Sequence, residues 1–336
     1  MGGLTGRRED NGMREVRFSL ERWDMQTPFA ITGHVFTGSD VLHVQVSENG
    51  ASGQGEGSGI YYFAETGESM LAQAEGIRSE LERGADRRAL RKLLPAGGAR
   101  NAIDCALWDL EAKRSGRSIW ELTGITPTKV VTFETVGIGS LAEMAAGAKR
   151  LDSPRIKVKL DGDDPLARVR AVREARPDAL IIVDVNQGWD FDLLRAVLPQ
   201  CVDLDLGMIE QPLPRGGDEA LEGYRSPVPL CADESCIDTG EFAQAARRYR
   251  MINIKLDKAG GLTEALDLAD LAQEHGLDLM VGNMMGTSLA MAPGYVLAQL
   301  CTYADLDGAL YLTRDREHAM RYEHGVVAAP TPALWG

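Results

Sequence analysis

Hydrophobic residues in the second half of the chain occur in short runs that alternate with helical segments. From Val130 onward there are eight such runs, rich in β-branched residues and about 25 residues apart. Strands that alternate with helices predict a parallel sheet with right-handed crossovers, and eight such strands predict a closed barrel. The runs are 130–136, 156–160, 180–185, 208–210, 229–232, 251–256, 277–281 and 302–305.

The first part of the chain has a different pattern. Residues 14–20 and 41–47 alternate polar and apolar side chains, as strands do. Residues 27–40 contain Pro28 and two glycines and predict a loop or hairpin tip, and the glycine-rich residues 50–59 predict a turn or mobile loop. Helical spacing is predicted for 68–83, 85–94 and 99–114, so that this part forms a small α+β domain.

Composition and charge exclude several classes of protein. The 336 residues carry a net charge of −14, which argues against a nucleic-acid surface, and no apolar run reaches transmembrane length. The N-terminal residues contain no apolar core of a signal peptide. The five cysteines form no CxxC pair and predict buried thiols in a reducing cytoplasm. No strand is followed by a glycine-rich dinucleotide or phosphate loop.

Charged residues end five consecutive barrel strands. The intervals between them are 25, 26, 23 and 22 residues, so each strand contributes one charged group at the same level. A single acid after a strand is commonly a helix N-cap, but five charged groups in phase favour an active site at the C-terminal mouth of a barrel. These residues are Lys159, Asp184, Glu210, Asp233 and Lys255.

The three acids in this series predict a metal site. Carboxylates on adjacent strands that converge on one point require a cation, and a ligand set made only of oxygens selects a hard ion, with Mg²⁺ fitting best. We therefore expect Asp184, Glu210 and Asp233 to bind Mg²⁺.

The lysines predict proton transfer. Lys157 and Lys159 are two residues apart and share one face of a strand, where mutual repulsion favours loss of a proton. An edge strand that exposes both lysines to water is the simpler interpretation of this stretch alone. Lys255, however, lies four strands from Lys159 in an eight-strand ring, so the two face each other. Two bases on opposite sides of a metal-bound carboxylate suit a 1,1-proton transfer, with Lys157 assisting.

With these residues the chain resembles the muconate-lactonising subgroup of the enolase superfamily, over about residues 14–330. The resemblance implies an α/β fold, a (β/α)7β modified TIM barrel with an α+β capping domain. The implied domains are a capping domain over 13–125, a barrel over 126–308 and a segment over 309–336 that returns to the cap. Residues 1–12 are expected to be a disordered extension before a natural start at Met13.

Within the subgroup the chain is most similar to dipeptide epimerases. Residues 101–110 are similar to their cap helix and residues 253–265 to their sixth barrel unit. Asp305 and Asp307, in Asp305-Leu306-Asp307-Gly308, match the pair that binds the α-ammonium group of a dipeptide. The resemblance implies a Mg²⁺-dependent epimerase of L-Ala-D/L-Glu from peptidoglycan recycling. The further substrate contacts that it implies are Thr135, Asn283, Met284, His34 and Phe36.

The sequence departs from this pattern at two places. Relatives that act on alanyl-glutamate often have an arginine near Phe36, where this chain offers only His34, and Asn283 stands where relatives often have cysteine. A dipeptide with an apolar second residue is therefore an alternative substrate. An N-acylamino acid racemase, an o-succinylbenzoate synthase or a non-catalytic metal-binding module are further alternatives. The expected partner is a small dipeptide, without nucleic acid or membrane, and a homo-oligomer is left open.

Overall fold

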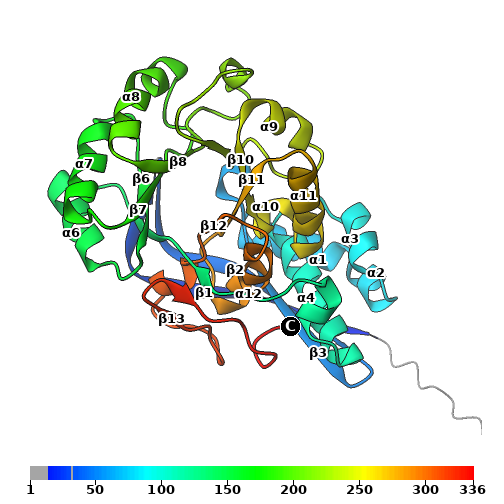
Figure 1. Cartoon of the computed structure of the whole chain (residues 1–336). Helices are drawn as coiled ribbons and strands as arrows, with labels where there is room; N and C mark the ends of the chain where they lie inside the picture. Colours follow the sequence, from blue (N-terminus) through cyan, green and yellow to red (C-terminus); the bar gives the residue numbers. More distant parts are fainter. Residues whose placement is uncertain (1–13, 32) are drawn as a thin grey trace, which may run out of the picture.

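The computed structural model describes residues 14–31 and 33–336, so the predictions for residues 1–12 and Met13 lie outside the described residues. Figure 1 shows a barrel surrounded by helices and, behind it, a separate sheet formed by the N-terminal part of the chain. The N-terminal sheet has three strands in the order β1-β2-β3, and the barrel sheet has eight.

The barrel consists of eight parallel strands in sequence order, from β5 to β12. A bridge between Thr132 and Ala304 joins the two edges of this sheet, and the Phe133 N–H donates to the Ala304 carbonyl oxygen at 2.8 Å. The predicted fold class is confirmed. The strands are β5 (Glu134–Val136), β6 (Arg155–Lys159), β7 (Leu180–Asp184), β8 (Leu206–Glu210), β9 (Leu230–Ala232), β10 (Met251–Lys255), β11 (Asp278–Gly282) and β12 (Tyr303–Ala304).

One predicted strand is divided between two sheets. Residues 130–136 were expected to form the first barrel strand, but β4 (Val130–Val131) pairs instead with β14 (Val326–Val327), which also pairs with β13 (Tyr322–Glu323). The barrel proper begins at Glu134. The helices that cover the barrel are α6 (Leu141–Arg150), α7 (Pro165–Ala175), α8 (Phe191–Asp203), α9 (Phe242–Arg248), α10 (Leu256–Ala259), α11 (Leu262–Glu274) and α12 (Ser288–Ala298).

Apolar side chains fill the barrel directly below the charged residues. Ile182, Met208 and Cys231 are fully buried and pack together inside the ring. Side chains two residues apart on a strand point to the same side. Asp184, Glu210 and Asp233 each follow one of these residues by two positions, so the same alternation that fills the barrel directs the three carboxylates into its mouth.

Glycines in the capping sheet allow a helix to pack against its backbone. Residues 50–59 were predicted to be a turn, but most of them form β3 (Ala51–Ser58), and this prediction is wrong. A side chain at Gly53, Gly55 or Gly57 would overlap the backbone of α4 (Gly98–Ser115). The glycines are therefore needed for close packing rather than for a bend.

Residues 27–40 were predicted to be a loop or a hairpin tip, and the structure places a hairpin tip within them, because β1 ends at Ile31 and pairs antiparallel with β2, which begins at His34. β1 (Glu15–Ile31) and β2 (His34–Glu48) continue through most of this range and form a long hairpin, with an irregular register between Asp24 and Phe29. The predicted helices are present, with the first divided in two. The helical elements of the N-terminal part are η1 (Tyr61–Phe63), α1 (Gly67–Gly76), α2 (Arg78–Glu82), α3 (Arg87–Leu93), α4 and α5 (Ile119–Thr123).

Helix α4 joins the N-terminal part to the barrel through buried polar contacts. Asn101 Nδ2 donates to Asp257 Oδ1 at 2.8 Å, and Asp257 lies two residues after Lys255. Asp104 accepts hydrogen bonds from the Thr263 N–H and hydroxyl at 3.0 and 2.6 Å. The segment that carries Lys255 is thus fixed against α4.

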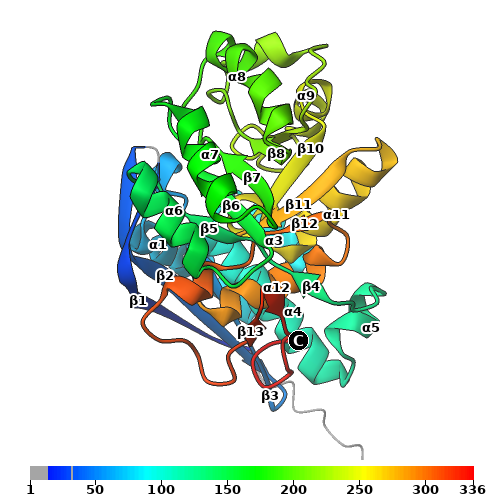
Figure 2. The same ribbon diagram turned by 60° about the vertical axis from the view of Figure 1, so that its left-hand side comes forward.

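The end of the chain also lies against α4, as Figures 1 and 2 both show. Trp335 Nε1 donates to the Cys105 carbonyl oxygen at 2.9 Å, and Gln54 Nε2 on β3 donates to the Leu334 carbonyl oxygen at 2.7 Å.

All five cysteines are free thiols, four of them buried. Within the described residues, no helix is long and apolar enough to cross a membrane.

Replacing Gly261 by alanine tests the contact between α4 and the barrel. Gly261 has φ +117°, and a Cβ there would overlap the Asp104 side chain. We expect Gly261→Ala to lower the free energy of unfolding by about 2–4 kcal/mol, through backbone strain and overpacking together. Gly276→Ala is the matched control, because Gly276 has φ +68° but nothing within 4 Å of its Cβ position. Urea denaturation should show a loss of only about 1 kcal/mol for the control, and equal losses would contradict this account.

Candidate active site

The charged residues predicted from strand spacing meet at the mouth of the barrel. Lys159, Asp184, Glu210 and Lys255 are the last residues of β6, β7, β8 and β10, and Asp233 follows β9 directly. Lys159 pairs with Asp184, and Asp184 with Glu210, in the register of the sheet. Each of the five side chains is buried. The structure thus brings together the whole set that the spacing predicted.

Lys157 lies at the centre of a carboxylate cluster. Its Nζ is 3.0 Å from Asp184 Oδ2, 2.9 Å from Glu210 Oε2 and 2.9 Å from Asp305 Oδ2. Burial alone would lower the pKa of Lys157, but these carboxylates outweigh it and raise the pKa well above its ordinary value. Repulsion between neighbouring lysines was expected to favour proton loss, and at Lys157 the carboxylates reverse that tendency.

Lys159 shares one of these carboxylates. Its Nζ is 2.5 Å from Asp184 Oδ2 and 3.0 Å from Asn186 Oδ1, so Lys157 and Lys159 do lie on the same face of β6. Both side chains are buried, which excludes the interpretation of an edge strand that exposes them to water. Burial would raise the pKa of Asp184, but the two ammonium groups hold it at about 2.

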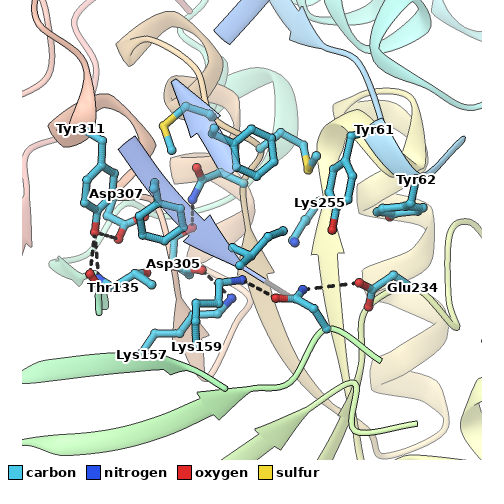
Figure 3. Close-up of a pocket in the computed structure, with 17 residues that line it drawn as sticks. Tyr61, Tyr62, Thr135, Lys157, Lys159, Glu234, Lys255, Asp305, Asp307 and Tyr311 are labelled. Atoms are coloured by element: carbon cyan, nitrogen blue, oxygen red, sulfur yellow. Dashed lines mark hydrogen bonds and ion pairs between the residues drawn. The ribbon is translucent and has the colours of Figure 1, made fainter. Parts of the chain in front are cut away.

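Lys255 reaches the site from the other side of the ring. Its Nζ is 2.7 Å from Asp233 Oδ2, and the fully buried Lys258 contacts Asp233 Oδ1 at 2.5 Å. Burial would raise the pKa of Asp233, but both lysines together hold it well below its usual range. β6 and β10 are four places apart in the eight-stranded sheet. Figure 3 shows Lys159 and Lys255 entering the same pocket from different strands.

The three predicted metal ligands form an oxygen-only donor set. Burial and the neighbouring Asp184 raise the pKa of Glu210 to about 7, which shows how costly a third ionised carboxylate is at this place. Lysine ammonium groups contact the same oxygens. The acidic, histidine and cysteine side chains of residues 14–31 and 33–336 form no ready-made metal cage. The chemistry of the donors fits a hard divalent cation, because all three side chains offer carboxylate oxygens.

Asp305 and Asp307 form a second acidic group beside the lysines. Asp305 directly follows β12 and contacts Lys157. Asp307 directly precedes η3 (Gly308–Tyr311) and accepts a 2.7 Å hydrogen bond from the Tyr311 hydroxyl. Burial and the nearby Asp305 raise the pKa of Asp307 to about 7. Both acids line one pocket with the three lysines.

This pocket contains most of the expected substrate contacts. Thr135, Asn283, Met284 and Phe36 line it, whereas the exposed His34 does not and instead places its ring 4.3 Å from that of Phe36. The described residues that line the pocket are Phe29, Ile31, Phe36, Tyr61, Tyr62, Thr135, Lys157, Lys159, Asn186, Glu234, Lys255, Asn283, Met284, Met285, Asp305, Asp307 and Tyr311.

Several residues of the pocket were not predicted from the sequence. Glu234 is buried beside Asp233, where burial and that neighbouring charge raise its pKa to about 8. Asn186 Nδ2 donates to Glu234 Oε1 at 3.4 Å; Glu234 is the residue after Asp233, and Asn186 lies two residues after Asp184. Their position after these strand ends was a usable signal. Tyr61 and Tyr62 come from the capping part, and no local pattern places them in the barrel mouth.

Comparison with known families identifies the class of protein. Residues 13–124 match the N-terminal domain of mandelate racemase and muconate lactonizing enzyme, and residues 140–333 match the enolase C-terminal domain-like family. The chain belongs to the mandelate racemase/muconate lactonizing enzyme family. The predicted membership of the enolase superfamily is confirmed.

Two relatives in this family have different named activities. The chain is 43% identical to the L-Ala-D/L-Glu epimerase of Escherichia coli K12, over 93% of this chain and 99% of that protein. It is 45% identical to an N-acetyl-D-glutamate racemase of a Pseudoalteromonas species, over 72% of this chain and 78% of that protein.

Two solved structures have the same architecture. One is an enolase family member from Agrobacterium tumefaciens, with homology to dipeptide epimerases, bound to sodium and L-Ala-L-Glu. It is 40% identical, with a TM-score of 0.93 over 96% of this chain and 100% of that chain. The other is a dipeptide epimerase from Methylococcus capsulatus complexed with Mg and L-Arg-D-Lys. It is 30% identical, with a TM-score of 0.90 over 96% of this chain and 99% of that chain.

Proposed function

We propose that the protein is a Mg²⁺-dependent dipeptide epimerase that inverts the α-carbon of the C-terminal residue. The observation that carries this proposal is the placement of Lys159 and Lys255 on opposite sides of the barrel, in one pocket that also contains Asp305 and Asp307. The activity named for the Escherichia coli relative supports it.

Lys159 and Lys255 would act as the two proton-transfer groups. One lysine, as the neutral amine, takes the α-proton from one face of the substrate, and the other, as the ammonium, delivers a proton to the opposite face. Burial would lower the pKa of Lys255, but Asp233 more than compensates and raises it, so Lys255 is an ammonium in the structure described here. Lys157, held by three acids, would supply a fixed positive charge for the substrate carboxylate.

Asp184, Glu210 and Asp233 would hold the metal. Mg²⁺ bound there would supply positive charge to stabilise the negative charge that develops on the substrate carboxylate. The Mg found in the Methylococcus capsulatus structure supports this assignment. Asn253 Nδ2 donates to Glu210 Oε1 at 2.6 Å, and Lys258 fixes Asp233, so two of the three carboxylates are oriented from behind.

The second residue of the substrate is less constrained by the pocket. Alanyl-glutamate from peptidoglycan recycling is the first candidate, since the Escherichia coli relative is named for it and the Agrobacterium tumefaciens structure contains L-Ala-L-Glu. An apolar second residue is the second candidate, because Phe29, Phe36 and Met285 line the pocket. Among the residues that the structure describes, the cationic side chains lining it are Lys157, Lys159 and Lys255. A comparison of kcat/KM for L-Ala-L-Glu and L-Ala-L-Leu distinguishes the two candidates, because the better substrate shows which second residue the pocket prefers.

The rival reaction is racemisation of an N-acylamino acid, the class to which the Pseudoalteromonas relative belongs. An N-acyl substrate has no ammonium group, so Asp305 and Asp307 would have no partner in it. Their burial in the same pocket as the lysines therefore favours the dipeptide.

Free cysteines suit a reducing cytoplasm as the place of action.

Replacing Glu210 by glutamine tests the metal assignment. The amide keeps the size of the side chain but removes a negative charge from the proposed ligand set. We expect Glu210→Gln to weaken Mg²⁺ binding at least about 100-fold in titration calorimetry and to abolish turnover, with the fold retained. Glu219→Gln, at an exposed position on η2 (Glu219–Leu221), is the control and should bind Mg²⁺ normally. Unchanged Mg²⁺ affinity of Glu210→Gln would rule out this site.

The substrate class is tested by comparing kcat/KM for a free-amine dipeptide with kcat/KM for the matching N-succinyl amino acid. A charge-assisted hydrogen bond contributes about 1.5–3 kcal/mol, or roughly ten- to a hundred-fold in affinity. We expect kcat/KM for the free-amine dipeptide to exceed that for the N-succinyl amino acid by at least about ten-fold. Asp307→Ala should reduce this ratio of kcat/KM values. Equal kcat/KM values for the two substrates with the wild-type enzyme would favour the racemase reaction instead.

A further inference from the structure

We propose that Tyr311 is a positioning residue that fixes the Asp307 carboxylate for the substrate ammonium group and connects it to the hairpin of the capping sheet. This inference rests on the proposed dipeptide substrate. It concerns a residue that the sequence did not single out, and it assigns Tyr311 no direct part in proton transfer.

The Tyr311 hydroxyl makes a connected set of hydrogen bonds. It accepts from the Thr135 N–H at 2.9 Å and lies 2.7 Å from Asp307 Oδ2 and 3.2 Å from the Thr135 carbonyl oxygen. A hydroxyl has one proton to donate, and the shorter distance directs it to Asp307. Because Thr135 belongs to β5, the rigid barrel sets the direction of the bond that holds Asp307.

Asp307 is held by the hydrogen bond from Tyr311, whereas Asp305 is held by an ion pair. Asp305 has an ion pair with Lys157, whereas Asp307 has no ion pair with any described residue. Asp305 Oδ1 is buried and lacks a hydrogen-bond partner within the part of the chain that the structure describes. Two buried acids line one pocket, and Lys157 pairs with only one of them. This leaves room for a second cation, which the ammonium group of a dipeptide would supply.

Contacts on the other side of Tyr311 reach the capping hairpin. The Phe29 and Tyr311 rings have centroids 5.4 Å apart. Gln26 Nε2 donates to the Leu310 and Leu312 carbonyl oxygens at 3.2 and 3.0 Å, and the Thr313 N–H donates to the Asp24 carbonyl oxygen at 2.9 Å. Strand β1 and the turn that carries Tyr311 are therefore joined above the pocket, and Figure 3 shows Tyr311, Asp307 and Thr135 together on one side of it.

Tyr311→Phe tests the inference, because phenylalanine keeps the ring against Phe29 and removes only the hydroxyl. For a free-amine dipeptide we expect KM to rise about ten-fold with kcat within about two-fold, since the ammonium lies away from the reacting carbon. For an N-acetyl amino acid, kcat/KM should be unchanged. Tyr295→Phe is the matched control, because its hydroxyl donates to the Thr128 carbonyl oxygen at 2.9 Å and it is not among the residues lining the pocket.

The outcomes separate this inference from the proposed function. A Tyr311→Phe variant with the KM of the wild type overturns the positioning role while leaving the epimerase intact. An equal loss with free-amine and N-acetyl substrates also overturns it, because that pattern indicates general damage to the pocket. If the wild type turns over N-acetyl amino acids but no free-amine dipeptide, the proposed function fails first, and the role of Tyr311 falls with it.

Discussion

The arrangement of the site depends on the pairing of buried charges at the barrel mouth. Lys157 contacts three carboxylates and Asp233 contacts two lysines, all nearly without exposure to water. An unpaired charge at such a depth costs several kcal/mol, so none of these groups is tolerated there alone. The pairing keeps lysines and carboxylates together in a small volume. The same volume is where a substrate carboxylate and a divalent cation would compete for these partners.

The rest of the fold keeps this group closed and aligned. Apolar residues such as Ile182 and Met208 fill the barrel from below, and the capping part covers it from above with Tyr61 and Phe36. The cap is fixed through α4, which packs on the glycines of β3 and holds the segment after Lys255 through Asn101. The proton transfers proposed for Lys159 and Lys255 would require such rigidity, because small displacements of reacting groups greatly reduce the rate.

Strand spacing predicted the barrel and its charged residues because both follow from local repeats. The alternation that buries Met208 also directs Glu210 into the mouth, and this period is visible in the sequence. Residues 50–59 were misread because glycine commonly marks turns, whereas here it allows contact with a helix about 50 residues away. Tyr61 and Tyr311 were missed for a similar reason: their place in the pocket comes from how the cap and the last turn pack on the barrel.

The central claim is that Lys159 and Lys255 serve opposite faces of one α-carbon. Solvent exchange of the α-proton in D₂O, followed for each epimer with Lys159→Ala and Lys255→Ala, tests it most directly. Both variants should lose epimerisation, and each should still exchange the α-proton of one epimer slowly, with the two variants retaining opposite epimers. Wild-type epimerisation by Lys255→Ala, or retention of the same epimer by both variants, would contradict the two-base account.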